Sequence, residues 1–115
     1  MIVRRLSEMT GGWIVGDFEP ACFRTTTCEV ACRHYDAGSI EAARVHQLAT
    51  EITVIASGCV EMNGRIFGAG DIVVLAPGEA ADFRAIEQTT TVLFKSALKR
   101  ALSESPGAAT APVAT

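Results

Sequence analysis

Three polar residues near the middle of the chain have types and spacing that suit a binding or catalytic site. Arg44 and His46 are two residues apart, and Glu51 follows five residues after His46. Residues two apart on a β-strand lie on the same face, and Glu51 returns to that face if it opens the next strand. Cationic donors beside a carboxylate indicate either a site that binds an anionic oxygen or a site that transfers a proton.

Two roles for these residues stay open at the level of sequence. His46 carries the side-chain type whose ordinary pKa lies near neutrality, so His46 and Glu51 are the candidate catalytic acid and base, with Arg44 stabilising a developing oxyanion. In the alternative interpretation, His46 is a hydrogen-bonded residue in the interior of a binding protein. The sequence does not decide whether the chain is an enzyme.

Composition limits the classes of protein to be considered. The chain has 115 residues, which suits one domain, and 13 acidic residues outnumber 10 basic ones, which does not favour nucleic-acid binding. It has no run of about 20 apolar residues that would span a membrane, and the N-terminus has no signal-peptide core. We therefore expect a cytoplasmic protein with a small-molecule partner and reduced cysteines, because its four cysteines form no CxxC pair.

The elements that would position these residues are short β-strands. Apolar runs broken by turn residues predict an all-β barrel or sandwich, with strands near residues 21–24, 28–36, 43–47, 51–56, 58–62, 65–67, 72–75, 80–85 and 88–96. The Asn63-Gly64 pair predicts a two-residue hairpin turn. A helix over residues 39–49 is rejected because it would bury Arg44 beside apolar side chains.

The predicted domain organisation has three parts. Residues 1–13 form an N-terminal arm or an extra strand, residues 14–102 form the barrel, and residues 103–115 form a disordered tail, because their small residues and prolines show no periodicity. Trp13 is expected to pack against its own barrel or against a twin subunit. Lys95, Lys99 and Arg100 are interpreted as a solvated face.

The glycines around the polar trio carry a family resemblance. Gly38, Glu51 and Gly58 match the first motif of the cupin superfamily in type and spacing, with His46 at its second histidine and Arg44 in place of its first. The second motif is met by Gly70 and Gly78, with Ala81 at its histidine and Ala85 at its asparagine. Over roughly residues 14 to 97 the chain therefore resembles the small single-domain cupins.

The resemblance implies a fold and an altered metal site. Cupins have a double-stranded β-helix, which is an antiparallel jelly-roll barrel, and small cupins are commonly homodimers. A metal-binding cupin uses three histidines and a glutamate. Here only His46 and Glu51 are kept, and a guanidinium at Arg44 has no lone pair to donate. We expect no cofactor; if iron, manganese, nickel or zinc binds, His46 and Glu51 are the ligands.

Other potential ligands near the motifs have simpler interpretations. Cys32 and His34 alternate on the preceding strand and are read as one core and one surface residue. Asp82 adjoins Ala81, but strict alternation would turn it away from the barrel interior when Ala81 and Phe83 face inward.

The function expected from the sequence is a small cupin that binds a small polar or anionic metabolite in its barrel. The ligand-binding residues are predicted to be Arg44, His46, Glu51 and Phe83. Arg44 either forms an ion pair with Glu51, in the place of a metal ion, or binds the ligand, and the two roles can coexist. The alternative function is a metal-dependent isomerase, epimerase, lyase or dioxygenase that uses His46 and Glu51.

Overall fold

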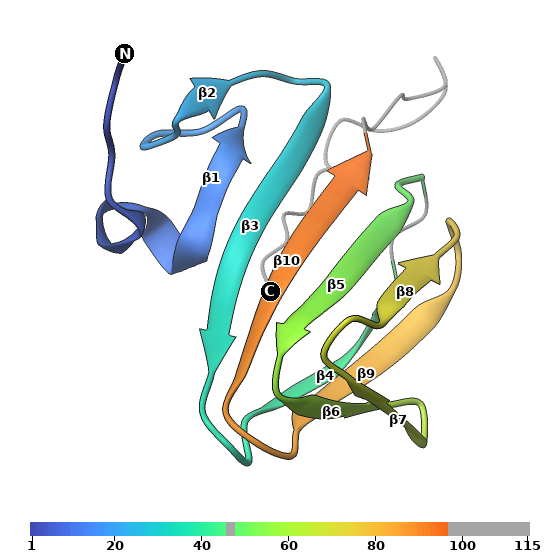
Figure 1. The fold of residues 1–115 in the computed structure, drawn as a ribbon. Coiled ribbons are helices and arrows are strands. Elements are labelled where there is room, and N and C mark those ends of the chain that lie inside the picture. Colours follow the sequence, from blue (N-terminus) through green and yellow to red (C-terminus); the bar gives the residue numbers. More distant parts are fainter. Residues whose placement is uncertain (46–47, 97–115) are drawn as a thin grey trace.

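The computed structural model describes residues 1–45 and 48–96, apart from the side chain of Arg44. The predicted tail, residues 103–115, lies outside this range. Two short 3-10 helices and ten strands make up the described part (Figure 1). They are η1 (Leu6–Glu8), η2 (Thr10–Gly12), β1 (Trp13–Gly16), β2 (Phe23–Arg24), β3 (Cys28–Tyr35), β4 (Ile40–Val45), β5 (Glu51–Ser57), β6 (Cys59–Met62), β7 (Arg65–Gly68), β8 (Ile72–Leu75), β9 (Ala80–Ala85) and β10 (Thr89–Ser96).

The strands form two sheets that pack on one another. The larger sheet has the order β2-β1-β3-β10-β5-β8, and the smaller one has the order β4-β9-β6-β7 (Figure 1). From β3 to β6 the chain passes back and forth between the two sheets, as in a jelly roll. Strand pairs are antiparallel except for the short β1–β2 pair, which is parallel. The predicted all-β, predominantly antiparallel fold is confirmed.

Turn chemistry fixes where the strands end. Asn63 and Gly64 have φ angles of 50° and 79°, and Met62 pairs with Arg65, so the predicted two-residue hairpin between β6 and β7 is confirmed. The turn before β8 is closed by the Asp71 carboxylate, which accepts a hydrogen bond from the Gly68 amide at 2.7 Å. Polar residues thus end the apolar runs in the way that the sequence predicts.

The core lies between β5 of the larger sheet and β6 and β9 of the smaller one. Alternate residues of these strands point inward, and their side chains are buried together; the cluster consists of Ile55, Val60, Met62, Phe83 and Ala85. Tyr35, Phe67, Val73 and Ala81 pack around it. Sequence alternation in β9 predicted inward positions for Ala81 and Phe83, and the structure places both at this interior.

The N-terminal segment adds a strand that the predicted strand list omitted. β1 pairs with β3, with Trp13 opposite Ala31, so the segment extends the larger sheet. The Trp13 ring contacts Phe18 edge to face, with 6.5 Å between ring centroids. Trp13 thus packs on its own sheet. An extra strand was one of the two alternatives for residues 1–13, but the observed strand starts only at Trp13, and its position was missed because WIVG is short and follows two glycines, which are typical of a loop.

Candidate functional site

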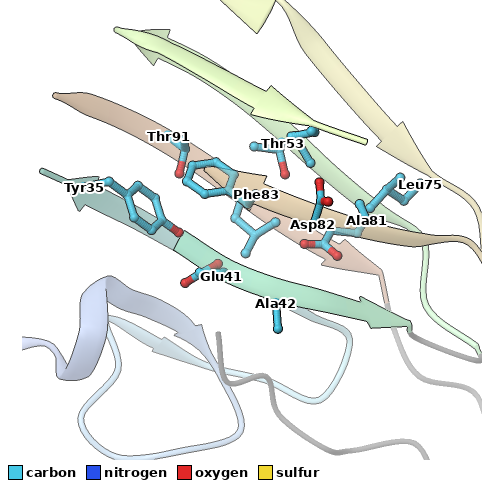
Figure 2. Close-up of a pocket in the computed structure, with 12 residues that line it drawn as sticks. Tyr35, Glu41, Ala42, Thr53, Leu75, Ala81, Asp82, Phe83 and Thr91 are labelled. Carbon is cyan, nitrogen blue, oxygen red and sulfur yellow. The ribbon is translucent and has the colours of Figure 1, made fainter. Parts of the chain in front are cut away.

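A small cavity opens between the two sheets beside the core. Its volume is about 60 Å³, and Figure 2 shows side chains of both sheets around it. The lining residues are Tyr35, Glu41, Ala42, Glu51, Thr53, Met62, Leu75, Ala81, Asp82, Phe83, Thr91 and Leu93. A cavity of this size holds a few water molecules or a ligand of a few heavy atoms, since a water molecule needs at least about 10–15 Å³ by a measure of this kind.

Tyr35 and Thr91 provide polar groups on the larger sheet. The Tyr35 hydroxyl hydrogen-bonds with Thr91, which favours the phenolate. Burial and the negative charge of Glu41 outweigh that bond and raise the pKa of Tyr35 to about 12. The hydroxyl is therefore a neutral group at physiological pH that can both donate and accept a hydrogen bond.

Glu41 and Arg33 form an ion pair at the edge of this site. Arg33 Nη2 lies 3.7 Å from Glu41 Oε2, and both side chains are largely shielded from solvent. The Arg33 guanidinium also lies 5.5 Å from the centre of the Tyr35 ring. A cation is thus held beside the Tyr35 phenol and the Glu41 carboxylate.

The apolar wall of the cavity is centred on Phe83. Phe83 is only 7% exposed, and its ring centre lies 4.5 Å from that of Tyr35, which joins β9 of one sheet to β3 of the other. Met62, Leu75 and Leu93 extend the wall. The site predicted to include Phe83 does have Phe83 in its lining.

Glu51 opens β5 and lines the cavity, as the spacing of the first motif required. Its backbone stands in register with Leu75 on β8 and with Lys95 on β10. Because paired residues on neighbouring strands share a face, Glu51 and Lys95 point to the same inner side of the sheet.

Arg44 and His46 fall at the limit of the structural description. The Arg44 backbone belongs to β4 and pairs with Ala81 on β9, whereas His46 and the Arg44 side chain lie outside the described part. Glu41 pairs with Phe83, so Ala42 and Ala43 together oppose the single residue Asp82, which is a β-bulge. The structure corrects the start of this strand, because β4 begins at Ile40 rather than at the predicted residue 43 and contains the bulge, while residues 46 and 47 lie outside the described part.

The described residues do not fit the metal site that the resemblance to cupins implies. Ala81, at the position of a histidine ligand, lines the cavity and has no donor atom. Asp82 borders the cavity rather than turning wholly away, but its Oδ1 accepts a hydrogen bond of 2.6 Å from the Asn63 amide. Within residues 1–45 and 48–96 no three His, Cys, Asp or Glu side chains gather as a metal site would require.

Cys32 and His34 do not line this cavity. Both alternate with the inward residues of β3, and His34 Nδ1 hydrogen-bonds with Thr90 Oγ1 at 2.8 Å at an exposed position. Cys32 is half-buried on the same outer side. Neither residue supplies a replacement ligand there.

Lys95 contradicts its share of the predicted solvated basic face, and Lys99 and Arg100 lie outside the described residues. Lys95 is 3% exposed, and its Nζ lies 5.7 Å from the centre of the Trp13 ring. Glu29 on β3 and Glu51 on β5 flank it in register. The sequence alternation that would predict burial of Lys95 is present, because Thr89, Thr91, Leu93 and Lys95 share one face of β10. The other face carries Val92 and Phe94, however, so the positions of the apolar residues do not show which face is inside.

Comparisons with known proteins bear on the fold. No protein-family model matches the chain, and no curated protein sequence matches it. Solved structures do match. A Klebsiella pneumoniae protein with a double-stranded β-helix domain is 24% identical over 67% of this chain and 69% of its own, with a TM-score of 0.61.

Two further structures agree with it. KdgF from Halomonas is 24% identical over 66% of this chain and 74% of its own, with a TM-score of 0.55. An RmlC-like cupin from Shewanella frigidimarina is 15% identical over 66% of this chain and 70% of its own, with a TM-score of 0.59. At these identities the likeness concerns the fold, and with the two packed sheets it shows that the chain has the double-stranded β-helix fold of the cupin superfamily.

Proposed function

We propose that this small cupin binds a small polar or anionic molecule in the cavity between its sheets. The observation that carries the proposal is the convergence of hydrogen-bonding groups with an apolar wall. Tyr35, Thr53, Thr91 and Glu51 line the same space as Phe83, Leu75 and Leu93. A few polar groups in a largely apolar pocket are typical of ligand sites, because the wall excludes water and the polar groups orient the ligand.

The volume narrows the choice of ligand. About 60 Å³ is well below the roughly 300–1,000 Å³ of pockets for drug-sized molecules. The ligand is therefore a compact molecule of a few heavy atoms, or the small polar end of a larger one. Hydroxyl and carboxylate oxygens are suited to the Tyr35 and Thr91 hydroxyls, which both donate and accept hydrogen bonds.

Arg44 and His46 are the proposed source of affinity for anions. Glu41 and Glu51 bring negative charge to the lining, and Arg33 lies 3.7 Å from Glu41 to offset part of it. An anionic oxygen needs further donors, and the first-motif positions of Arg44 and His46 would supply them. This part of the proposal rests on their spacing in the sequence.

The test is thermal unfolding of the full chain with a panel of small carboxylates, phosphate and neutral polyols. A ligand at 100 times its dissociation constant stabilises the native state by about 2.7 kcal/mol, which raises the melting temperature by several degrees. The response should be lost in Arg44→Ala for anions and should persist in Arg84→Ala. Arg84 is the matched control because it forms an exposed pair with Glu61 on the outer side of the smaller sheet. A panel without any hit, or equal loss in both variants, would refute the proposal.

Elemental analysis of chelator-free protein separates this proposal from the metal-dependent alternative. One equivalent of a transition metal per chain would favour His46 and Glu51 as ligands and an enzymatic role. Proton transfer by His46 and Glu51 stays a prediction from the sequence.

A further inference from the structure

A groove lies between the N-terminal segment and strand β3, on the β1 side of β3. Figure 1 shows the 3-10 helices η1 and η2 next to β1, which follows η2 directly and pairs with β3. The groove is open to solvent and has a volume of about 540 Å³. Its lining consists of Leu6, Ser7, Met9, Gly11, Gly12, Cys32, Arg33 and His34. We refer to it as the N-terminal groove, and none of these residues lines the cavity between the sheets.

Three side chains of the N-terminal groove carry donor atoms that suit a soft metal ion. Cys32 supplies a thiol, His34 an imidazole and Met9 a thioether. Within the described part of the chain, the lining holds no carboxylate of the kind that magnesium and calcium require. Thiolate and thioether ligands select Cu(I) among the first-row metals.

Cys32 and His34 are spaced for binding one ion together. They are two residues apart on β3, so their side chains lie on the same face of the strand, about 6.8 Å apart along it. A thiolate and the longer imidazole span that distance around one ion, with metal–ligand bonds of about 2.0–2.3 Å. Cys32 is half-buried, and the groove gives an ion a path to it.

His34 is held in an orientation that leaves one ring nitrogen for a ligand. Its Nδ1 lies 2.8 Å from Thr90 Oγ1, and the two residues stand opposite each other on β3 and β10. A metal at Nε2 requires the proton on Nδ1, where the Thr90 oxygen is placed to accept it. A hydrogen bond at the other ring nitrogen is the usual support of a ligand histidine.

The backbone of the N-terminal segment places Met9 at the same groove. The Met9 N–H donates to the Leu6 carbonyl at 3.0 Å and so ends η1. Two residues into η2, the chain comes so close to β3 that a Cβ at Gly12 would collide with the Cys32 carbonyl oxygen. Met9 lies between these two fixed points and is only 7% exposed, so its thioether is withheld from solvent.

Charge and ligand number favour a monovalent ion over zinc. Arg33 also lines the groove, and its Nη2 lies 3.7 Å from Glu41 Oε2. One thiolate neutralises Cu(I), whereas a divalent ion with one thiolate would leave a net positive charge near that guanidinium. Three protein donors also fall short of the four that a structural zinc site has.

We propose that Cys32, His34 and Met9 bind one Cu(I) ion in the N-terminal groove, through Sγ, Nε2 and Sδ. The Cys32 thiol releases its proton on binding, and the ion keeps its oxidation state. The site lies on a different part of the molecule from the cavity between the sheets and involves neither His46 nor Glu51. A bound ion would join the N-terminal segment to β3.

Anaerobic competition of the full chain with the Cu(I)–bicinchoninate complex tests the proposal. We expect the wild-type protein to take up one Cu(I) per chain. Cys32→Ser should weaken the affinity at least about 100-fold, and His34→Gln and Met9→Leu at least about 10-fold each, because each change removes one of three donors. X-ray absorption of the copper-loaded protein should show two sulfur ligands and one nitrogen ligand.

Matched controls separate this site from binding by any thiol, any thioether or the barrel. Cys28→Ser is the first, because Cys28 is half-buried on the same face of β3 but does not line the groove. Met62→Leu is the second, because Met62 is 7% exposed, as Met9 is. His46→Gln is the third and removes a predicted ligand of the barrel. All three variants should keep the wild-type affinity for Cu(I).

Each outcome decides the proposal. Loss of affinity in the three groove variants but in none of the controls supports it. No uptake of Cu(I) by the wild type would overturn it, as would an equal loss in Cys28→Ser, a loss in His46→Gln, or a copper spectrum with one sulfur ligand. Circular dichroism shows whether each variant is folded. His34 is exposed, so its glutamine variant is compatible with a folded chain, and unchanged affinity there would also overturn the proposal.

Discussion

Lys95 places its ammonium group 5.7 Å from the centre of the Trp13 ring. The contact joins β10 to β1 across the intervening strand β3, because Trp13 pairs with Ala31 and Lys95 pairs with Glu29. The N-terminal strand is thereby attached to the sheet by a cation–π contact as well as by its backbone ladder.

The Lys95–Trp13 contact should be measurable as a coupling free energy. Lys95→Met removes the charge and keeps most of the aliphatic packing, and Trp13→Leu removes the aromatic face. In a double-mutant cycle of urea unfolding we expect the two to be coupled by about 1–2 kcal/mol, the range for a shielded cation–π pair. Additive effects of the two substitutions would show that the contact does not contribute.

The cost of Lys95→Met should also depend on pH. Burial raises the pKa of Glu29, and the charge of Lys95 partly opposes that rise. A carboxyl whose folded pKa is raised destabilises the fold as pH rises through that pKa, and loss of Lys95 enlarges this effect. Lys95→Met should therefore lower the free energy of unfolding more at pH 7 than at pH 3.5, where Glu29 is largely protonated, and the partial exposure of Glu29 keeps the difference below about 1 kcal/mol. Glu29→Gln in the Lys95→Met background should remove most of the difference.

Tyr35 is the single tyrosine of the chain, so its titration can be followed directly by tyrosinate absorbance. We expect a midpoint at about pH 12 in the folded protein and about pH 10 in denaturant. The stability that the neutral phenol contributes should be complete below pH 10 and lost as pH rises towards 12. Glu41→Gln should lower the midpoint, because the neighbouring negative charge is one cause of the shift. A folded-state midpoint near 10 would contradict the burial of this hydroxyl.

Gly58 should be far less tolerant of a side chain than Gly70. Both have positive φ angles, 98° and 92°, but a Cβ at Gly58 would collide with the Thr89 side chain and lie 2.5 Å from the Gln88 carbonyl oxygen, whereas open space surrounds Gly70. We expect Gly58→Ala to lower the free energy of unfolding by about 3 kcal/mol or more, and Gly70→Ala by about 1 kcal/mol from backbone strain. Chemical denaturation of both variants measures the two free energies of unfolding. Equal losses of stability would mean that the backbone around Gly58 shifts to admit a Cβ without cost.

Restoring the lost histidines should create metal affinity. Ala81 lines the cavity opposite the Arg44 backbone position. Arg44→His with Ala81→His removes a fixed cation and adds two donors, so affinity for zinc or nickel should rise by at least about 100-fold over wild type by calorimetry. Arg84→His in the Arg44→His background is the control, because Arg84 lies on the same strand but pairs with Glu61 and does not line the cavity. Unchanged affinity in the double variant would contradict the prediction that Arg44 and Ala81 oppose metal binding.

The parts of the fold that the sequence predicted correctly depend on backbone conformation. The motif glycines Gly38, Gly58, Gly70 and Gly78 all have φ between 89° and 98°, a region that side chains disfavour. The turns require these glycines whether or not the cavity holds a metal ion. The glycine spacing of the motif can therefore be recognised even where its metal ligands are absent. This is why the fold could be predicted from the glycines, whereas the altered metal site stays a prediction from the sequence.

The parts that the sequence did not predict depend on how strands meet. Glu41 reaches the cavity because β4 contains a bulge, and no local signal in IEAARV marks it. Lys95 was assigned to the surface because lysine usually lies there, and only the register with Glu29 and Glu51 shows that its face is inside. Thr91 and Tyr35 belong to the same category, because their contact joins residues far apart in the sequence.

The bulge at Ala42 and Ala43 bears on how this barrel could have diverged. Glu41 lies on one side of it and Arg44 on the other, opposite Phe83 and Ala81 respectively. A substitution at either alanine leaves two residues opposite Asp82, so the bulge is kept. Deletion of one alanine would remove the bulge, restore plain alternation and turn one half of the strand over relative to the other. Lineages that share this cavity should therefore vary freely in residue type at the bulge while keeping its length, and a one-residue gap there would mark a barrel with a different interior.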